Sequence, residues 1–177
     1  MRRLTTFAIV VVLGMGLGAC GKHGAKNVYS CPNKGPGVGF KGVKSGKLTV
    51  QTSLPAAGWW TGSGVDALTG GPEFEFAKDL CAQLGIGKVR IVSVSQSSIE
   101  AGTNIDFDLG LARIPIAGEA GKKVDVSSSY FTTAQGVQLG VVLPKGSADT
   151  ALVNTAIAKL KANGTLTSVF KNAPTTP

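Results

Sequence analysis

The sequence has little of the chemistry that enzymes and metal sites use. Its single histidine, His23, lies in a glycine- and lysine-rich stretch near the start, so a Ser-His-Asp or Cys-His arrangement has no base in the rest of the chain. CxxC, HExxH and acidic calcium-loop patterns are all missing from the sequence. We therefore expect no enzyme, no metal site and no cofactor.

Long apolar runs are equally scarce. The one near the start, from Phe7 to Leu13, follows Arg2 and Arg3 and precedes small residues, which is the order of an export signal. It is shorter than the roughly 20 apolar residues that a membrane-spanning helix needs. We expect residues 1–19 to be a signal peptide that is removed.

Acidic residues are absent from residues 20–47, which hold six lysines and seven glycines. Residues 48–177 instead balance ten basic against ten acidic side chains. This composition predicts a basic, flexible tether over 20–47 and one domain over 48–177. The tether either favours anionic lipid headgroups or is merely solvated. Because the domain itself is neutral, the sequence pI of about 9.6 is no argument for nucleic-acid binding.

Cysteine is rare, with three in the chain. Apart from Cys20, Cys31 and Cys81 remain, and two remaining cysteines in an exported protein suggest a disulfide, here joining the tether to the domain. The alternative is that Cys81 is only a small buried residue on an apolar helix face.

The domain alternates between strand and helix patterns. β-Branched and apolar runs predict strands, and apolar stripes at helical spacing predict helices. Strands separated by helices favour an α/β fold with a mostly parallel sheet and helices on both faces. The expected strands are 48–54, 88–94, 105–112 and 135–143, and the expected helices are 72–85, 148–164 and 165–172.

The signal region ends in a recognisable motif. Leu17-Gly18-Ala19-Cys20 resembles the lipobox of bacterial lipoproteins. The resemblance implies that Cys20 is lipid-modified, becomes the first residue of the mature protein and anchors it extracytoplasmically to the cell membrane. The alternative is an ordinary secretion signal with Cys20 as a spare thiol.

Several motifs in order resemble one family. SGKLTV, GPEFEFAKDL, FDLGLA, KKVDVSSSYF and LVNTAIAKLKANGTLTSVFKN are together similar to the extracytoplasmic solute-binding proteins of polar amino-acid ABC importers. The resemblance covers most of residues 45–172 and implies a periplasmic-binding-protein-like lobe. In the family two such lobes enclose an amino acid. Here GVVLPKGS follows SSYF closely, so the second lobe is missing, and we expect the two hinge strands to be fused into one segment at 132–143.

The ligand-gripping motif of the family is altered. The family pattern is similar to A-G-x-T-x-T-x-E-R, in which hydroxyls and the arginine bind the ligand carboxylate. In the matching stretch, residues 112–120, the threonine positions hold Pro115 and Ala117, and the arginine position holds Ala120. The amino-acid site is therefore expected to be eroded.

Two other residues remain candidates for ligand binding. Arg113 stands where the family has glycine, and it is either a displaced carboxylate clamp or the partner of Glu119 in a surface ion pair. Gln96 stands near the position of an aromatic wall in the family.

Trp59 and Trp60 lie in the glycine-rich stretch AGWWTGSG and are expected to be exposed. The resemblance implies that they stack on a ligand; alternatively they are anchors at a protein interface, or they pack back onto the domain. The expected function is a lipid-anchored binding module for an amino-acid-like solute, associated with an ABC permease or a sensor. The alternative is an interaction or structural lipoprotein whose uncovered half-cleft binds a partner or a second copy, as in a homodimer.

Overall fold

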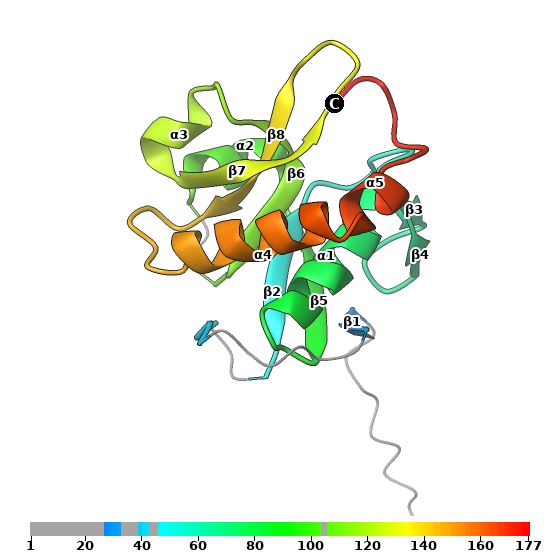
Figure 1. Ribbon diagram of the computed structural model, residues 1–177, viewed down its shortest axis with the longest axis horizontal. Coiled ribbons are helices and arrows are strands. Elements are labelled where there is room, and N and C mark those ends of the chain that lie inside the picture. Colours follow the sequence, from blue (N-terminus) through cyan, green and yellow to red (C-terminus); the bar gives the residue numbers. More distant parts are fainter. Residues whose placement is uncertain (1–26, 33–38, 43–45, 104–105) are drawn as a thin grey trace, which may run out of the picture.

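The computed structural model describes residues 27–32, 39–42, 46–103 and 106–177 (Figure 1). The expected signal peptide and Cys20 lie outside this part of the chain. The elements of the described part are β1 (Val28–Ser30), β2 (Leu48–Thr52), β3 (Thr61–Gly62), β4 (Leu68–Gly70), α1 (Pro72–Gln83), β5 (Lys88–Ser93), α2 (Gln96–Ala101), β6 (Leu109–Pro115), α3 (Ala120–Lys123), β7 (Asp125–Thr132), β8 (Gln138–Leu143), α4 (Thr150–Ala162) and α5 (Thr165–Val169).

A mixed six-stranded sheet forms the centre of the fold, in the order β1-β5-β2-β6-β8-β7. β2 pairs in parallel with both β5 and β6. β1 is antiparallel to β5, and β8 is antiparallel to both β6 and β7, so β7 runs in the same direction as the central strands. The expected α/β architecture is confirmed, with its parallel pairs in the middle of the sheet.

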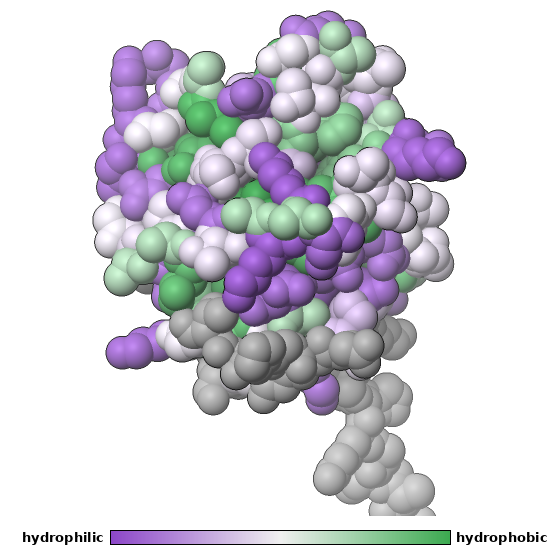
Figure 2. All heavy atoms as spheres, in the orientation of Figure 1, coloured by the Kyte–Doolittle hydropathy of each residue, from purple (hydrophilic) through white to green (hydrophobic). Residues whose placement is uncertain are grey.

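Helices cover both faces of this sheet. The larger core packs side chains of α1, α4 and α5 against one face, and the smaller core packs Ile99 of α2 and Ala120 of α3 against the other. Figure 1 shows α4 crossing in front of the sheet. The outer surface over α4 is a mixture of hydrophilic and hydrophobic residues (Figure 2).

Helix α1 follows from its sequence. Pro72 occupies the first turn, where a missing N–H costs nothing, and Phe76, Ala77 and Leu80 are fully buried along one stripe. Gly85, with φ of 75°, reverses the chain just after the helix. The predicted helix over 72–85 is confirmed apart from its last two residues.

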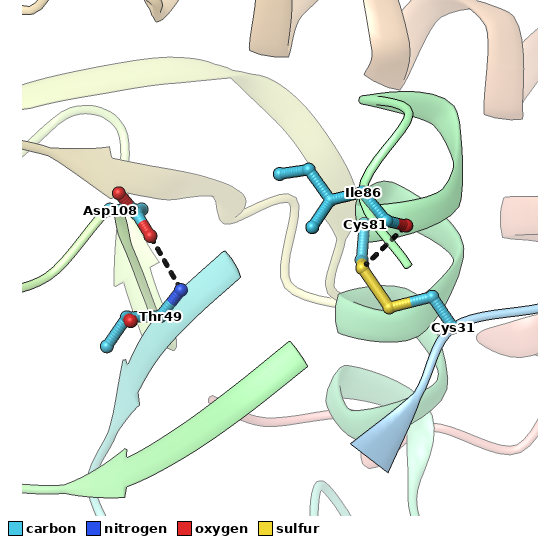
Figure 3. Close-up of a disulfide and its surroundings, with 5 residues drawn as sticks. All are labelled: Cys31, Thr49, Cys81, Ile86 and Asp108. Atoms are coloured by element: carbon cyan, nitrogen blue, oxygen red, sulfur yellow. Dashed lines mark hydrogen bonds between the residues drawn. A yellow bond between two sulfur atoms is a disulfide. The ribbon is translucent and has the colours of Figure 1, made fainter. Parts of the chain in front are cut away.

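The third strand starts later than expected, at Leu109 rather than residue 105. Asp108 stands before it, and its Oδ2 accepts a hydrogen bond from the backbone N–H of Thr49 at 2.6 Å (Figure 3). This carboxylate therefore caps the amino end of β2.

The expectation of one fused hinge strand at 132–143 is wrong. β7 and β8 are two antiparallel strands that pair from Asp125 with Leu143 to Thr132 with Gln138. Thr133 closes the turn between them, because its N–H donates to the Val137 carbonyl at 2.9 Å and its Oγ1 accepts from the Val137 N–H at 3.2 Å. The chain thus reverses at the point where the resembled family crosses into a second lobe.

Part of the expected tether belongs to the fold. β1 pairs with β5, and Cys31 next to it forms a disulfide with Cys81 of α1 (Figure 3). The Cys81 sulfur also lies 3.3 Å from the Ile86 carbonyl oxygen; since a disulfide sulfur carries no hydrogen, this contact is not a hydrogen bond. Cys81 is fully buried as well as paired. Since β1 and Cys31 precede residue 48 and are joined to the domain, the folded domain begins before residue 48.

The disulfide links residues 50 positions apart. Closing a loop of that length restricts the unfolded chain, so reduction should lower the free energy of unfolding by about 2 to 4 kcal/mol. Urea unfolding with and without reductant measures the difference. A Cys31→Ser/Cys81→Ser variant is the control, because reductant should leave it unchanged. Equal unfolding midpoints for the oxidised and reduced wild type would contradict this prediction.

Candidate functional site

A pocket opens beside the carboxyl ends of β2 and β5. Its volume is about 580 Å3. Ser93 ties these strand ends together, since its Oγ accepts a hydrogen bond from the Leu54 N–H at 3.2 Å. Ligands of open α/β sheets bind at this edge. The lining consists of Leu54, Pro55, Ala56, Ala57, Trp60, Gly62, Ser63, Gly64, Val65 and Ser93.

The β3–β4 hairpin forms the outer wall of this pocket. Tyr29 of β1 holds the hairpin, because its hydroxyl donates to the Val65 carbonyl at 2.6 Å and accepts from the Leu68 N–H at 3.1 Å. Gly62 is required where the two strands meet, since a Cβ there would collide with the backbone of Ala67. The segment that carries Cys31 therefore also positions the pocket wall.

The two tryptophans are buried, with 3% of Trp59 and 4% of Trp60 exposed, so the expectation that they are exposed is wrong. Both backbone N–H groups donate to the Ala56 carbonyl, at 3.0 and 2.9 Å, and this tight turn directs the indoles inward. Trp59 packs edge-on against Phe131 with ring centroids 5.7 Å apart. Trp60 lines the pocket, and its Nε1 donates to Oε2 of Glu73 at 2.6 Å.

Glu73, at the start of α1, is fully buried and gathers donors from three other segments. Besides the Trp60 indole, its Oε1 accepts from the Arg113 backbone N–H at 2.9 Å and from the Tyr130 hydroxyl at 2.5 Å. The Arg113 Nη1 lies 3.5 Å from Oε2. We call Glu73, Trp60, Arg113 and Tyr130 the Glu73 cluster.

Burial sets the protonation of this cluster. It raises the pKa of the Glu73 carboxyl above its ordinary 4.5, against the opposing effects of the Tyr130 bond, the Arg113 charge and the Trp60 bond. Burial and the neighbouring carboxylate also hold the pKa of Tyr130 well above 10.0. Tyr130 is therefore a permanent donor at neutral pH.

Arg113 does not form the surface ion pair with Glu119 that was one alternative from the sequence. Glu119 pairs instead with Lys122 at 2.8 Å, and Arg113 turns inward to Glu73. Its φ of 56°, rare for a non-glycine residue, accompanies a register shift between β6 and β8 that points its N–H at Glu73. The side chain is 10% exposed, and its buried Nη1 has no hydrogen-bond acceptor among the described residues.

Gln96 lies on the surface of α2, where its Nε2 donates to Glu100 at 3.0 Å. Of the four candidate ligand residues, the lining of the pocket includes Trp60 and omits Trp59, Gln96 and Arg113. Whether any of them binds a ligand stays a prediction.

Sequence reasoning missed Glu73, although a signal was present. Glu73 lies three, four and seven residues before Phe76, Ala77 and Leu80, on the apolar stripe of α1. An acid on a buried helix face needs internal partners. Tyr130 and Ser93 carried no comparable signal.

Within the described ranges no three His, Cys, Asp or Glu side chains gather as a metal site would require. None of the described helices has the length and apolar character needed to cross a membrane.

The raised pKa of Glu73 gives stability a pH dependence of definite sign. Between pH 4.5 and its folded-state pKa, the native carboxyl keeps a proton that the unfolded chain releases. The free energy of unfolding should therefore fall as pH rises through this window, and Glu73→Gln should remove that slope. Urea unfolding at a series of pH values measures it.

Asp79, whose pKa is also raised by burial, supplies the control. Asp79→Asn should leave the contribution of Glu73 in place. A slope that Glu73→Gln leaves intact would show that other groups cause the pH dependence.

Comparison with known proteins bears on the fold. No family model and no curated protein sequence matches the chain. Among solved structures it is similar to the arginine-bound form of domain 1 of TmArgBP, with a TM-score of 0.57 and 22% identity over 65% of this chain and 94% of that one.

Two further structures agree. The ancestral cationic amino acid solute-binding protein AncCDT-1 gives a TM-score of 0.62 at 16% identity, over 73% of this chain and 96% of that one. A putative ABC transporter binding component from Wolinella succinogenes, complexed with lysine, gives 0.61 at 12% identity over the same shares. The chain thus has the fold of the amino-acid solute-binding proteins of ABC transporters, as the sequence resemblance predicted, and it matches an isolated domain 1 over nearly the whole length of that domain.

Proposed function

We propose that this protein is a lipid-anchored extracytoplasmic binding module, descended from an amino-acid solute-binding protein of an ABC transporter and reduced to one lobe. The observation that carries the proposal is the pocket of about 580 Å3 at the carboxyl ends of β2 and β5. It lies where this fold class binds its ligands, and its volume falls in the usual range of about 300 to 1,000 Å3 for small-molecule sites.

The shape of the pocket bears on how a single lobe can enclose a small ligand. A cleft between two lobes buries most of a small ligand, and one lobe supplies only one wall of that cleft. Here the β3–β4 hairpin supports a second wall, because Gly62, Ser63, Gly64 and Val65 face the strand-end residues Leu54 and Ser93 across one pocket. A solute bound there needs no second lobe.

Erosion of the inherited amino-acid site is part of the proposal. Arg113, the candidate carboxylate clamp, is 10% exposed and paired with Glu73. A ligand carboxylate would have to displace a buried ion pair, and breaking such a pair costs about 3 to 5 kcal/mol. This cost supports weak binding of free amino acids.

The anchor rests on the Leu17-Gly18-Ala19-Cys20 motif. Attached to the outer side of the membrane, the module would serve a permease or a sensor. Cys20→Ser should abolish palmitate labelling and release the protein from the membrane fraction, and labelling that persists in the variant would contradict this anchor.

The alternative function, an interaction or structural lipoprotein, relied partly on Trp59 and Trp60 as anchors for a partner. Both indoles are buried, so this argument for it is removed. It remains as an outcome of the binding test below.

A solute panel tests the proposed function. We expect at least one small solute to raise the melting temperature of residues 20–177 carrying Cys20→Ala, and to shift the amide signals of Ser63, Val65 and Ser93. Thermal shift and two-dimensional NMR measure these effects across amino acids, sugars, amides and aromatic alcohols. No response to any solute, together with a dimeric mass by light scattering, would favour the interaction alternative instead.

A further inference from the structure

The pocket beside β2 and β5 has an unusual lining for a fold whose relatives are named for amino-acid binding. None of the described residues that line it is charged. Its side-chain polar groups are the hydroxyls of Ser63 and Ser93 and the indole N–H of Trp60. Ser93 already accepts from the Leu54 N–H at 3.2 Å.

The indole N–H of Trp60 already has a hydrogen-bond acceptor inside the protein. Trp60 Nε1 donates to Glu73 at 2.6 Å, so the small part of Trp60 that lines the pocket, from a side chain 4% exposed, offers aromatic carbon and no free donor. The same bond fixes the orientation of the ring before any ligand arrives. A rigid aromatic wall favours apolar and aromatic ligands.

Arg113, the candidate cation from the sequence, supplies no charge to this lining. Arg113 is not among the lining residues, and its guanidinium faces Glu73 in a buried ion pair at 3.5 Å. Glu73 is itself fully buried and surrounded by donors. The charges of this region thus neutralise each other inside the protein rather than at the pocket surface.

This lining discriminates by charge. A zwitterionic amino acid in the pocket would find no oppositely charged side chain among the described lining residues to replace the hydration that its charged groups lose. An uncharged molecule of the same shape loses only apolar and hydroxyl hydration, and burial of its apolar surface favours binding.

From the uncharged lining, the committed indole N–H and the internal pairing of Arg113 with Glu73, we infer that the solute of this module is an uncharged, largely apolar small molecule, bound against Trp60 between the ends of β2 and β5 and the β3–β4 hairpin. The inference rests on the proposed function and names its substrate class. It departs from the charged ligands of the similar structures.

A matched pair of probes tests it. 3-Phenyl-1-propanol and L-phenylalanine share a phenyl ring and a three-carbon chain and differ in charge. Titrated calorimetrically into residues 20–177 carrying Cys20→Ala, the alcohol should bind at least tenfold more tightly than the amino acid. L-Arginine, bound by one of the similar structures, should behave like L-phenylalanine.

A blocking variant locates the binding. Gly64 lines the pocket with an ordinary φ, and a Cβ there meets nothing within 4 Å, so Gly64→Phe adds a bulky ring to the pocket wall without a clash at Cβ. Gly121 of α3 has the same properties away from the pocket, so Gly121→Phe is the matched control. Binding of the alcohol should be lost in Gly64→Phe and kept in Gly121→Phe.

The outcomes separate the two proposals. Binding of L-phenylalanine or L-arginine as tight as that of the alcohol would overturn the uncharged substrate class while leaving a solute-binding module. Alcohol binding that survives Gly64→Phe would overturn the assigned pocket. If neither probe nor any solute of the wider panel binds, both the substrate class and the proposed function are wrong.

Discussion

The buried carboxylate of Glu73 is the interaction on which the rest of the site depends. It joins four segments that are distant in the sequence: the start of α1, the tryptophan loop, β6 and β7. Each donor it accepts from would otherwise be buried without a partner, at a cost of about 1 to 3 kcal/mol for each group. The carboxylate in turn would be an unpaired buried charge without them. The cluster is therefore stable only as a whole.

This cluster explains why the site differs from the one that the sequence resemblance implies. Arg113 is turned inward to Glu73, and the rings of Trp59 and Trp60 are buried in the same region. Tyr130 stacks on Phe76, with ring centroids 4.8 Å apart, and so couples the cluster to the aromatic core. What faces solvent at the strand ends is a neutral pocket.

The sequence predicted the features that local periodicity controls. The helix from Pro72 was predicted within two residues, and the alternation of strands and helices indicated an α/β sheet covered on both faces. The resemblance supplied the lobe, which similar solved structures share.

The features that were predicted wrongly depend on contacts between residues that are distant in the sequence. The inward turn of the tryptophans depends on Ala56 and Glu73, which no local pattern links to them. The hairpin of β7 and β8 was not predicted, because the burial of β7 does not alternate along the strand and its turn is closed by hydrogen bonds between Thr133 and Val137. Arg113 pairs with Glu73, 40 residues away in the sequence, whereas proximity in the sequence suggested Glu119 as its partner.

The most direct test of this account is a carbon-13 NMR titration of the Glu73 carboxyl, with the Trp60 indole N–H signal followed in the same samples. The account predicts that the carboxyl titrates above pH 4.5 and that the indole signal moves with it, since the two groups share a hydrogen bond. A Glu73 carboxyl that titrates at 4.5 or below, with an indole signal that does not respond, would contradict the cluster at the centre of this structure.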